Sequence, residues 1–99
     1  MNMQKLNNYD VIYFSGSFCN PCKVSKPFVE KVSNEKNIKT LFFIVDEEID
    51  GKEIADLYNI KAVPTILFLK DGLEIGRNVG AVTEQKFSEL HTKYFSVNS

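Results

Sequence analysis

The chain is 99 residues long, of which 43% are hydrophobic and 25% are charged, and its formal net charge is −1. This length suits a single domain over residues 1–99, with enough apolar side chains for a core that needs no further support. A near-neutral mixture of charges argues against nucleic acid or an anionic membrane as the main partner, and no apolar run is long enough to span a bilayer.

The first third of the chain predicts a strand followed by a helix. Residues 1–8 are polar and are expected to form a lead-in or a short helix. Residues 9–15 are rich in aromatic and β-branched side chains, which predicts a buried strand. Helical spacing follows over residues 19–34, with a kink expected at Pro27 and a turn over residues 34–37.

The middle of the chain predicts a second strand and a second helix. The continuous apolar run within residues 39–46 indicates a strand that is covered on both faces, as in an α/β sheet. The acidic residues 47–51 are expected to form a solvated loop. Apolar residues at helical spacing predict a short amphipathic helix over residues 52–59.

A β-hairpin is predicted next. Residues 65–70 form an apolar strand, and Asp71-Gly72 is the strongest hairpin signal in the chain. Residues 73–79 should therefore return antiparallel, and Gly76 within them indicates a bulge.

The last predicted element is a helix that Thr83 is expected to cap and that ends near Tyr94. His91 on this helix is expected to be a partly exposed surface residue. The element order β-α-β-α-β-β-α indicates an α/β fold in which a central mixed sheet, with parallel strands and an antiparallel hairpin, is flanked by helices.

The only two cysteines, Cys19 and Cys22, lie where the first predicted strand meets the first predicted helix. Helix positions i and i+3 share a face, with Cβ atoms about 5–6 Å apart, which is near the spacing that a disulfide needs. The unpaired N–H groups and the dipole at a helix start favour a thiolate at Cys19. A C-x-x-C pair at this junction is typical of a dithiol redox site.

Other interpretations of the cysteine pair are less favoured. A structural disulfide across four residues would constrain the unfolded chain little. A zinc site usually needs four ligands, and the single histidine, His91, is far along the chain. Inert thiols and a metal or cluster site shared between chains therefore stay open as minor alternatives.

From about Val11 to Tyr94 the sequence resembles the thioredoxin family. The resemblance is carried by the order of five motifs: Phe18-Cys19-Asn20-Pro21-Cys22-Lys23, Pro27, Val63-Pro64-Thr65, Lys70-Asp71-Gly72 and Val79-Gly80. It implies the thioredoxin fold, with Cys19 as the attacking thiolate and Cys22 as the resolving thiol.

The resemblance also implies a substrate-binding surface. Pro64 is expected to be cis and to face the cysteines, and the backbone of Val63 is expected to pair with an extended substrate segment. Gly80 would let a partner backbone approach, and Phe18 and Pro21 would complete an apolar, nearly flat surface. From the residues alone, Pro64 also fits the start of a strand and Gly80 a turn.

The chain departs from the family pattern at several points. The stretch before the first predicted strand is short, so the usual first strand and helix are expected to be shortened or absent. Phe18 and Ser15 stand where the family has tryptophans near the site, and Tyr13 stands where it has a buried aspartate. That aspartate helps to deprotonate the resolving thiol in the family, so the resemblance predicts a slower second step here.

These observations predict a cytoplasmic, monomeric thiol–disulfide oxidoreductase that reduces disulfides in protein substrates. Residues 1–10 have no apolar signal-peptide core, and a vicinal cysteine pair in a reducing compartment is usually catalytic. No flavin or nicotinamide motif is present, so no cofactor is expected and a separate thioredoxin reductase should recycle the protein. The alternatives are a glutaredoxin-like reductase recycled by glutathione and a non-catalytic thioredoxin-fold binding subunit.

Overall fold

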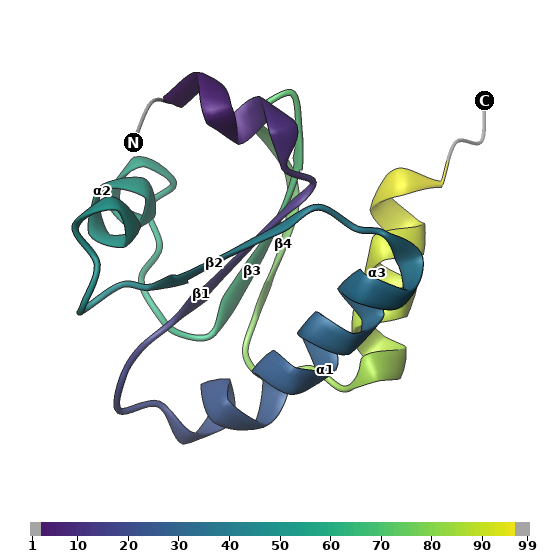
Figure 1. Cartoon of the computed structure of the whole chain (residues 1–99), viewed down its shortest axis with the longest axis horizontal. Coiled ribbons are helices and arrows are strands. Elements are labelled where there is room, and N and C mark those ends of the chain that lie inside the picture. Colours follow the sequence, from purple (N-terminus) through teal and green to yellow (C-terminus); the bar gives the residue numbers. More distant parts are fainter. Residues whose placement is uncertain (1–2, 97–99) are drawn as a thin grey trace.

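A four-stranded sheet with the strand order β2-β1-β3-β4 forms the centre of the computed structural model, which describes residues 3–96 (Figure 1). The strands are β1 (Val11–Ser15), β2 (Thr40–Ile44), β3 (Thr65–Lys70) and β4 (Leu73–Val79). The remaining elements are η1, a 3-10 helix (Met3–Asn8), and the α-helices α1 (Asn20–Lys36), α2 (Ile49–Leu57) and α3 (Glu84–Phe95). The order and type of the elements confirm the α/β prediction.

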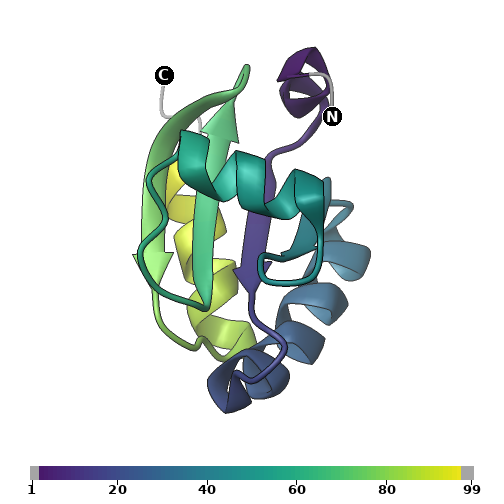
Figure 2. The same cartoon turned by 90° about the vertical axis from the view of Figure 1, so that its left-hand side faces the viewer.

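The sheet is covered on both faces, as Figure 2 shows with α2 in front of the strands and α1 and α3 behind them. Alternate residues of the central strands enter two cores. In β1, Val11 and Tyr13 pack with α1 and α3, whereas Ile12 and Phe14 pack with Leu6 of η1 and with α2. The buried run in β1 therefore reflects a strand between two layers of helix.

Strand directions correct one part of the prediction. β1 pairs parallel with β2, but it pairs antiparallel with β3, with Phe14 opposite Thr65. The segment between α2 and β3 brings the chain to the carboxyl end of β1, so β3 starts there and runs back. Only one strand pair is parallel, and Pro64 comes to lie beside the end of β1.

β2 differs from the expected strand because it lies at the edge of the sheet. It is shorter than residues 39–46, and only Phe43 in it is buried, whereas its other residues are half-exposed. An edge strand has a single hydrogen-bonded neighbour, so one flank of a continuous apolar run stays open to solvent.

Two predicted loops are partly helical. α1 continues to Lys36, where Asn37 ends it in a left-handed conformation with φ 55°, so residues 34–36 are not a turn. α2 begins at Ile49, because Asp50 suits the positive end of the helix and Gly51 allows close packing on Phe43. A Cβ placed on Gly51 would lie 3.1 Å from the Cβ of Phe43.

The hairpin and the last helix confirm the prediction. Asp71 and Gly72 both have positive φ, and the β3–β4 register shifts by one residue beside Gly76. A Cβ on Gly76 would overlap the ring of Tyr94, so the two elements pack closely there. Thr83 caps α3 by accepting a hydrogen bond from the Lys86 N–H at 3.1 Å.

Candidate active site

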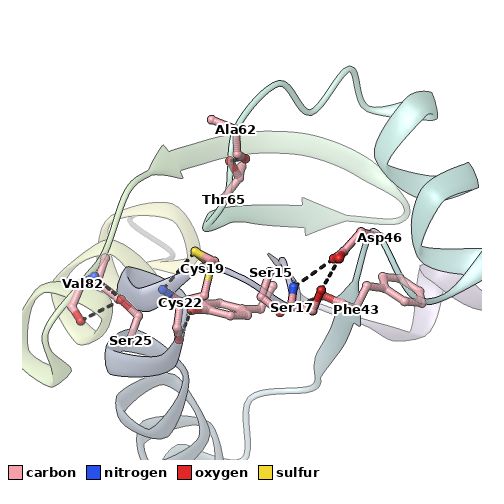
Figure 3. The surroundings of a disulfide bond; sticks show 11 residues. Ser15, Ser17, Cys19, Cys22, Ser25, Phe43, Asp46, Ala62, Thr65 and Val82 are labelled. Atoms are coloured by element: carbon pink, nitrogen blue, oxygen red, sulfur yellow. Dashed lines mark hydrogen bonds between the residues drawn. A yellow bond between two sulfur atoms is a disulfide. The ribbon is translucent and has the colours of Figure 1, made fainter.

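The cysteine pair occupies the start of α1, directly after the loop that follows β1. Cys19 is the N-cap of α1, and its Sγ accepts a hydrogen bond from the backbone N–H of Cys22 at 3.2 Å. The two residues are joined by a disulfide, with their Cα atoms 5.2 Å apart (Figure 3). Pro21 lies in the first turn, where a backbone N–H needs no partner. On reduction, the amide and the helix dipole are placed to stabilise a thiolate at Cys19.

The two sulfurs differ in access to solvent. Cys19 is 8% exposed and Cys22 is 2% exposed, so a substrate disulfide can reach the first more readily. Pro21 is exposed beside them, and the side chain of Phe18 is 99% exposed. Phe18 therefore projects into solvent, where it can pack only on a bound partner.

The segment before β3 lies against the redox loop. The Val63–Pro64 peptide bond is cis, which confirms that prediction. A Cβ placed on Gly16 would lie 3.3 Å from Val63 Cγ2 and 3.8 Å from Cys19 Cβ. The side chains of Val63 and Cys19 are therefore both close to Gly16. The Thr65 hydroxyl donates to the Ala62 carbonyl at 2.6 Å and closes the turn that holds Val63 and Pro64 (Figure 3).

Gly80 joins this surface through its backbone. Its N–H donates to the carbonyl of Pro64 at 2.8 Å. Its φ is +110°, which disfavours any residue with a Cβ, and no atom lies within 4 Å of the position that a Cβ would take. The structure therefore places Gly80 next to Pro64 with open space in front of it.

Tyr13 lies beneath the cysteines and is fully buried. Its hydroxyl donates to the carbonyl of Cys22 at 3.0 Å. Burial raises the pKa of Tyr13 to about 12, against the opposing effect of a hydrogen bond with Ser25. The phenol is therefore neutral near pH 7, where it is a hydrogen-bond donor and not a base.

Asp46 is a site residue that sequence reasoning missed. One carboxylate oxygen accepts from the Ser17 N–H at 2.9 Å, and the other accepts from the Ser17 hydroxyl (Figure 3). Because the ionised form accepts both bonds, they lower the pKa of Asp46. Asp46 could have been identified from its position at the end of the second strand. The carboxyl ends of parallel strands meet at one edge of a sheet, so this residue lies near the end of β1 and the loop that follows it.

Within residues 3–96, no three side chains of His, Cys, Asp or Glu are arranged to hold a metal ion. His91 lies on α3, half-buried, with its ring centroid 4.9 Å from that of Phe95. None of the described helices combines the length and the apolar character that crossing a membrane would take.

Comparison with known proteins places this site in a family. Residues 2–93 match the family model described as Thioredoxin. Thioredoxin H9 of Arabidopsis thaliana is 41% identical over 72% of this chain, which spans only 49% of that relative's length. A thioredoxin of Mycoplasmoides gallisepticum is 30% identical over 85% of this chain and 82% of its own.

Similar solved structures are also thioredoxins. The structure of Fasciola hepatica thioredoxin has a TM-score of 0.74 at 34% identity, covering 85% of this chain and 78% of that one. Reduced Schistosoma mansoni thioredoxin has a TM-score of 0.78 at 27% identity, covering 94% and 87%. These matches favour thioredoxin over the glutaredoxin-like and non-catalytic alternatives. The chain belongs to the thioredoxin family, and the cysteine pair at the start of α1 makes it a thiol–disulfide oxidoreductase.

Proposed function

We propose that this protein reduces disulfide bonds in other proteins, with Cys19 as the nucleophile and Cys22 as the resolving thiol. The observation that carries this assignment is the position of the Cys19 sulfur at the N-terminus of α1, where it accepts the Cys22 N–H. Cys19 is also the more exposed of the two cysteines. A nucleophilic thiolate needs both stabilisation and access, and Cys19 is the better placed for each.

The reaction takes two exchange steps. The Cys19 thiolate attacks one sulfur of the substrate disulfide, forms a mixed disulfide and releases the other substrate sulfur as a thiolate. Cys22 then loses its proton and attacks the Cys19 sulfur, which forms the Cys19–Cys22 disulfide and releases the second substrate thiolate. Two electrons pass from the cysteine pair to the substrate, and an external reductase must return two electrons for the next cycle.

An extended substrate segment would bind along Val63. This residue is half-buried and precedes β3, and its backbone has no hydrogen-bond partner within residues 3–96. Its N–H and C=O can therefore pair with a substrate backbone in the manner of an added strand. Pro21 and Phe18 offer apolar contacts on one side, and Gly80 leaves room for the partner beside Pro64.

We further propose that the protein acts as a cytoplasmic monomer recycled by a thioredoxin reductase. Insulin reduction provides the test, with NADPH and thioredoxin reductase in one assay and glutathione with its own reductase in the other. The wild type should turn over with the first system at least about tenfold faster. Cys19→Ser should be inactive in both. Activity retained by Cys19→Ser, or preference for glutathione, would contradict the proposal.

A further inference from the structure

The loop of residues 16–19 carries Cys19 but is held by few contacts of its own. It joins the end of β1 to α1, and Phe18 at its centre is 99% exposed, so packing of that side chain does not fix the backbone. The described loop is held instead at Ser17. Both the N–H and the hydroxyl of Ser17 donate to the carboxylate of Asp46.

Asp46 is anchored by the sheet beside the loop. It directly follows Val45, whose N–H donates to the carbonyl of Ser15 at 2.9 Å and so extends the pairing of β2 with β1. The carboxylate also lies close to the reactive cysteine. A Cβ on Gly16 would be 3.6 Å from Asp46 Oδ1 and 3.8 Å from Cys19 Cβ. Figure 3 shows Asp46 reaching from the end of β2 toward Ser17.

We propose that Asp46 is a positioning residue for Cys19. Its two hydrogen bonds to Ser17 hold the backbone two residues before Cys19, so the sulfur stays at the start of α1 and open to attack on a substrate. Asp46 also carries a negative charge, which by Coulomb repulsion disfavours a second negative charge nearby, although solvent screens this effect because Asp46 is exposed. This inference rests on the proposed role of Cys19 as the nucleophile.

The two effects of Asp46 have different consequences and can be separated by substitution. Asp46→Ala removes both the hydrogen bonds and the charge. Asp46→Asn removes the charge but keeps a side-chain oxygen that can accept the Ser17 N–H. Ser17→Ala removes only the hydroxyl bond and leaves the charge in place.

Glu47→Gln is a matched control for the loss of one negative charge. Glu47 is exposed and lies one residue further along the same connection. Within the part of the chain that the structure describes, its side chain makes no hydrogen bond or ion pair. Glu47→Gln therefore reports the effect of losing one negative charge in this region without losing a contact.

The experiment measures alkylation of Cys19 in the fully reduced protein by iodoacetamide between pH 5 and 10, with the labelled cysteine identified by mass spectrometry. Each pH profile gives a limiting rate constant for the thiolate and a midpoint for its ionisation. Asp46→Asn removes the charge but keeps an acceptor for the loop, so its midpoint should move to lower pH by less than about one unit. Asp46→Ala should have its midpoint at higher pH than Asp46→Asn, because a Cys19 sulfur that is no longer held at the start of α1 loses the stabilisation that the Cys22 N–H and the helix dipole give to its thiolate. Ser17→Ala keeps the charge and loses one hydrogen bond, so its midpoint should lie above that of the wild type, and Glu47→Gln should match the wild type.

A purely structural role for Asp46 would lower the unfolding midpoint but leave the alkylation profile of the folded protein unchanged, and that result would overturn the inference. An equal change in Glu47→Gln would overturn it as well. If Asp46→Ala does not fold, Asp46→Asn and Ser17→Ala still decide the matter, and wild-type profiles in both would count against the inference. Insulin reduction by Cys19→Ser tests the proposed function separately, since it does not depend on Asp46.

Discussion

The hydroxyl of Tyr13 donates to the carbonyl of Cys22 at 3.0 Å, so a neutral phenol lies directly beneath Cys22, for which we propose the resolving role. This position is buried in the core that β1 shares with α1 and α3. The phenol ties the strand to the first turn of α1, but with a pKa of about 12 it cannot accept the Cys22 proton near neutral pH.

Tyr13→Asp should speed the resolving step and destabilise the fold. An ionised aspartate could take the Cys22 proton, which should raise the rate of mixed-disulfide resolution at least about tenfold at pH 8. Replacing a buried ring with a smaller carboxyl group should lower the free energy of unfolding by about 2–5 kcal/mol. Stopped-flow decay of a preformed Cys19 mixed disulfide and urea unfolding measure the two effects.

Tyr13→Phe is the control for that experiment. It keeps the ring but removes the hydroxyl, with its hydrogen bonds to Cys22 and Ser25, so it should cost about 1–2 kcal/mol of stability and leave the resolving rate unchanged. A folded Tyr13→Asp protein that resolves no faster at any pH would show that a base at this position gives no advantage here.

Cys22→Ser should accumulate covalent complexes with protein partners, whereas Cys19→Ser should trap few. The first variant keeps the attacking sulfur at the start of α1 but has no thiol to release the mixed disulfide. Both variants can be incubated with cell lysate and compared on non-reducing gels, with the double variant as the blank. Equal trapping by the two single variants would be inconsistent with the assigned roles.

Gly76→Ala should destabilise the protein because its Cβ would overlap the ring of Tyr94. The ring must shift away from Phe68, whose centroid lies 4.9 Å from that of Tyr94, so we expect a loss of about 1–3 kcal/mol. In the Tyr94→Ala background, the same substitution should be nearly neutral. Urea unfolding of the four proteins forms a double-mutant cycle, and additive effects would rule out the steric contact as the cause.

Stability should depend on the single histidine as the pH falls below the ordinary histidine pKa of about 6.5. Burial on α3 and the charge of Lys36 lower the pKa of His91, against the attraction of Asp10. The unfolded chain therefore binds a proton at a higher pH than the native protein, so stability is complete above the unfolded pKa and falls as the pH drops through it. His91→Gln should flatten this part of the curve of unfolding midpoint against pH, and an unchanged slope would contradict the assignment.

Local patterns in the sequence were sufficient to predict β1, the hairpin at Asp71-Gly72 and the cap at Thr83. Each of these depends on residues close together in the chain, such as two turn residues that tolerate positive φ. The pairing of Cys19 with Cys22 has the same local character, because one helical turn sets it.

The features that were missed depend on residues far apart in the chain. The composition of β2 does not show that it lies at an edge of the sheet, and the composition of β3 does not show that it runs antiparallel to β1. Both depend on which strands pair in the folded chain. The bond between Ser17 and Asp46 joins residues 29 positions apart, and only the parallel pairing of β1 with β2 brings them together. The helical start of α2 was missed because the acidic run of residues 47–51 was interpreted as a solvated loop, whereas Gly51 packs closely on Phe43 at the start of the helix.

The hydrogen bond from the Cys22 N–H to the Cys19 sulfur exists while the two cysteines are still oxidised. The amide dipole that will stabilise the thiolate is therefore in place before the electrons arrive. Because this N–H already points at the Cys19 sulfur, the start of α1 offers a preorganised polar group for thiol–disulfide exchange in both directions.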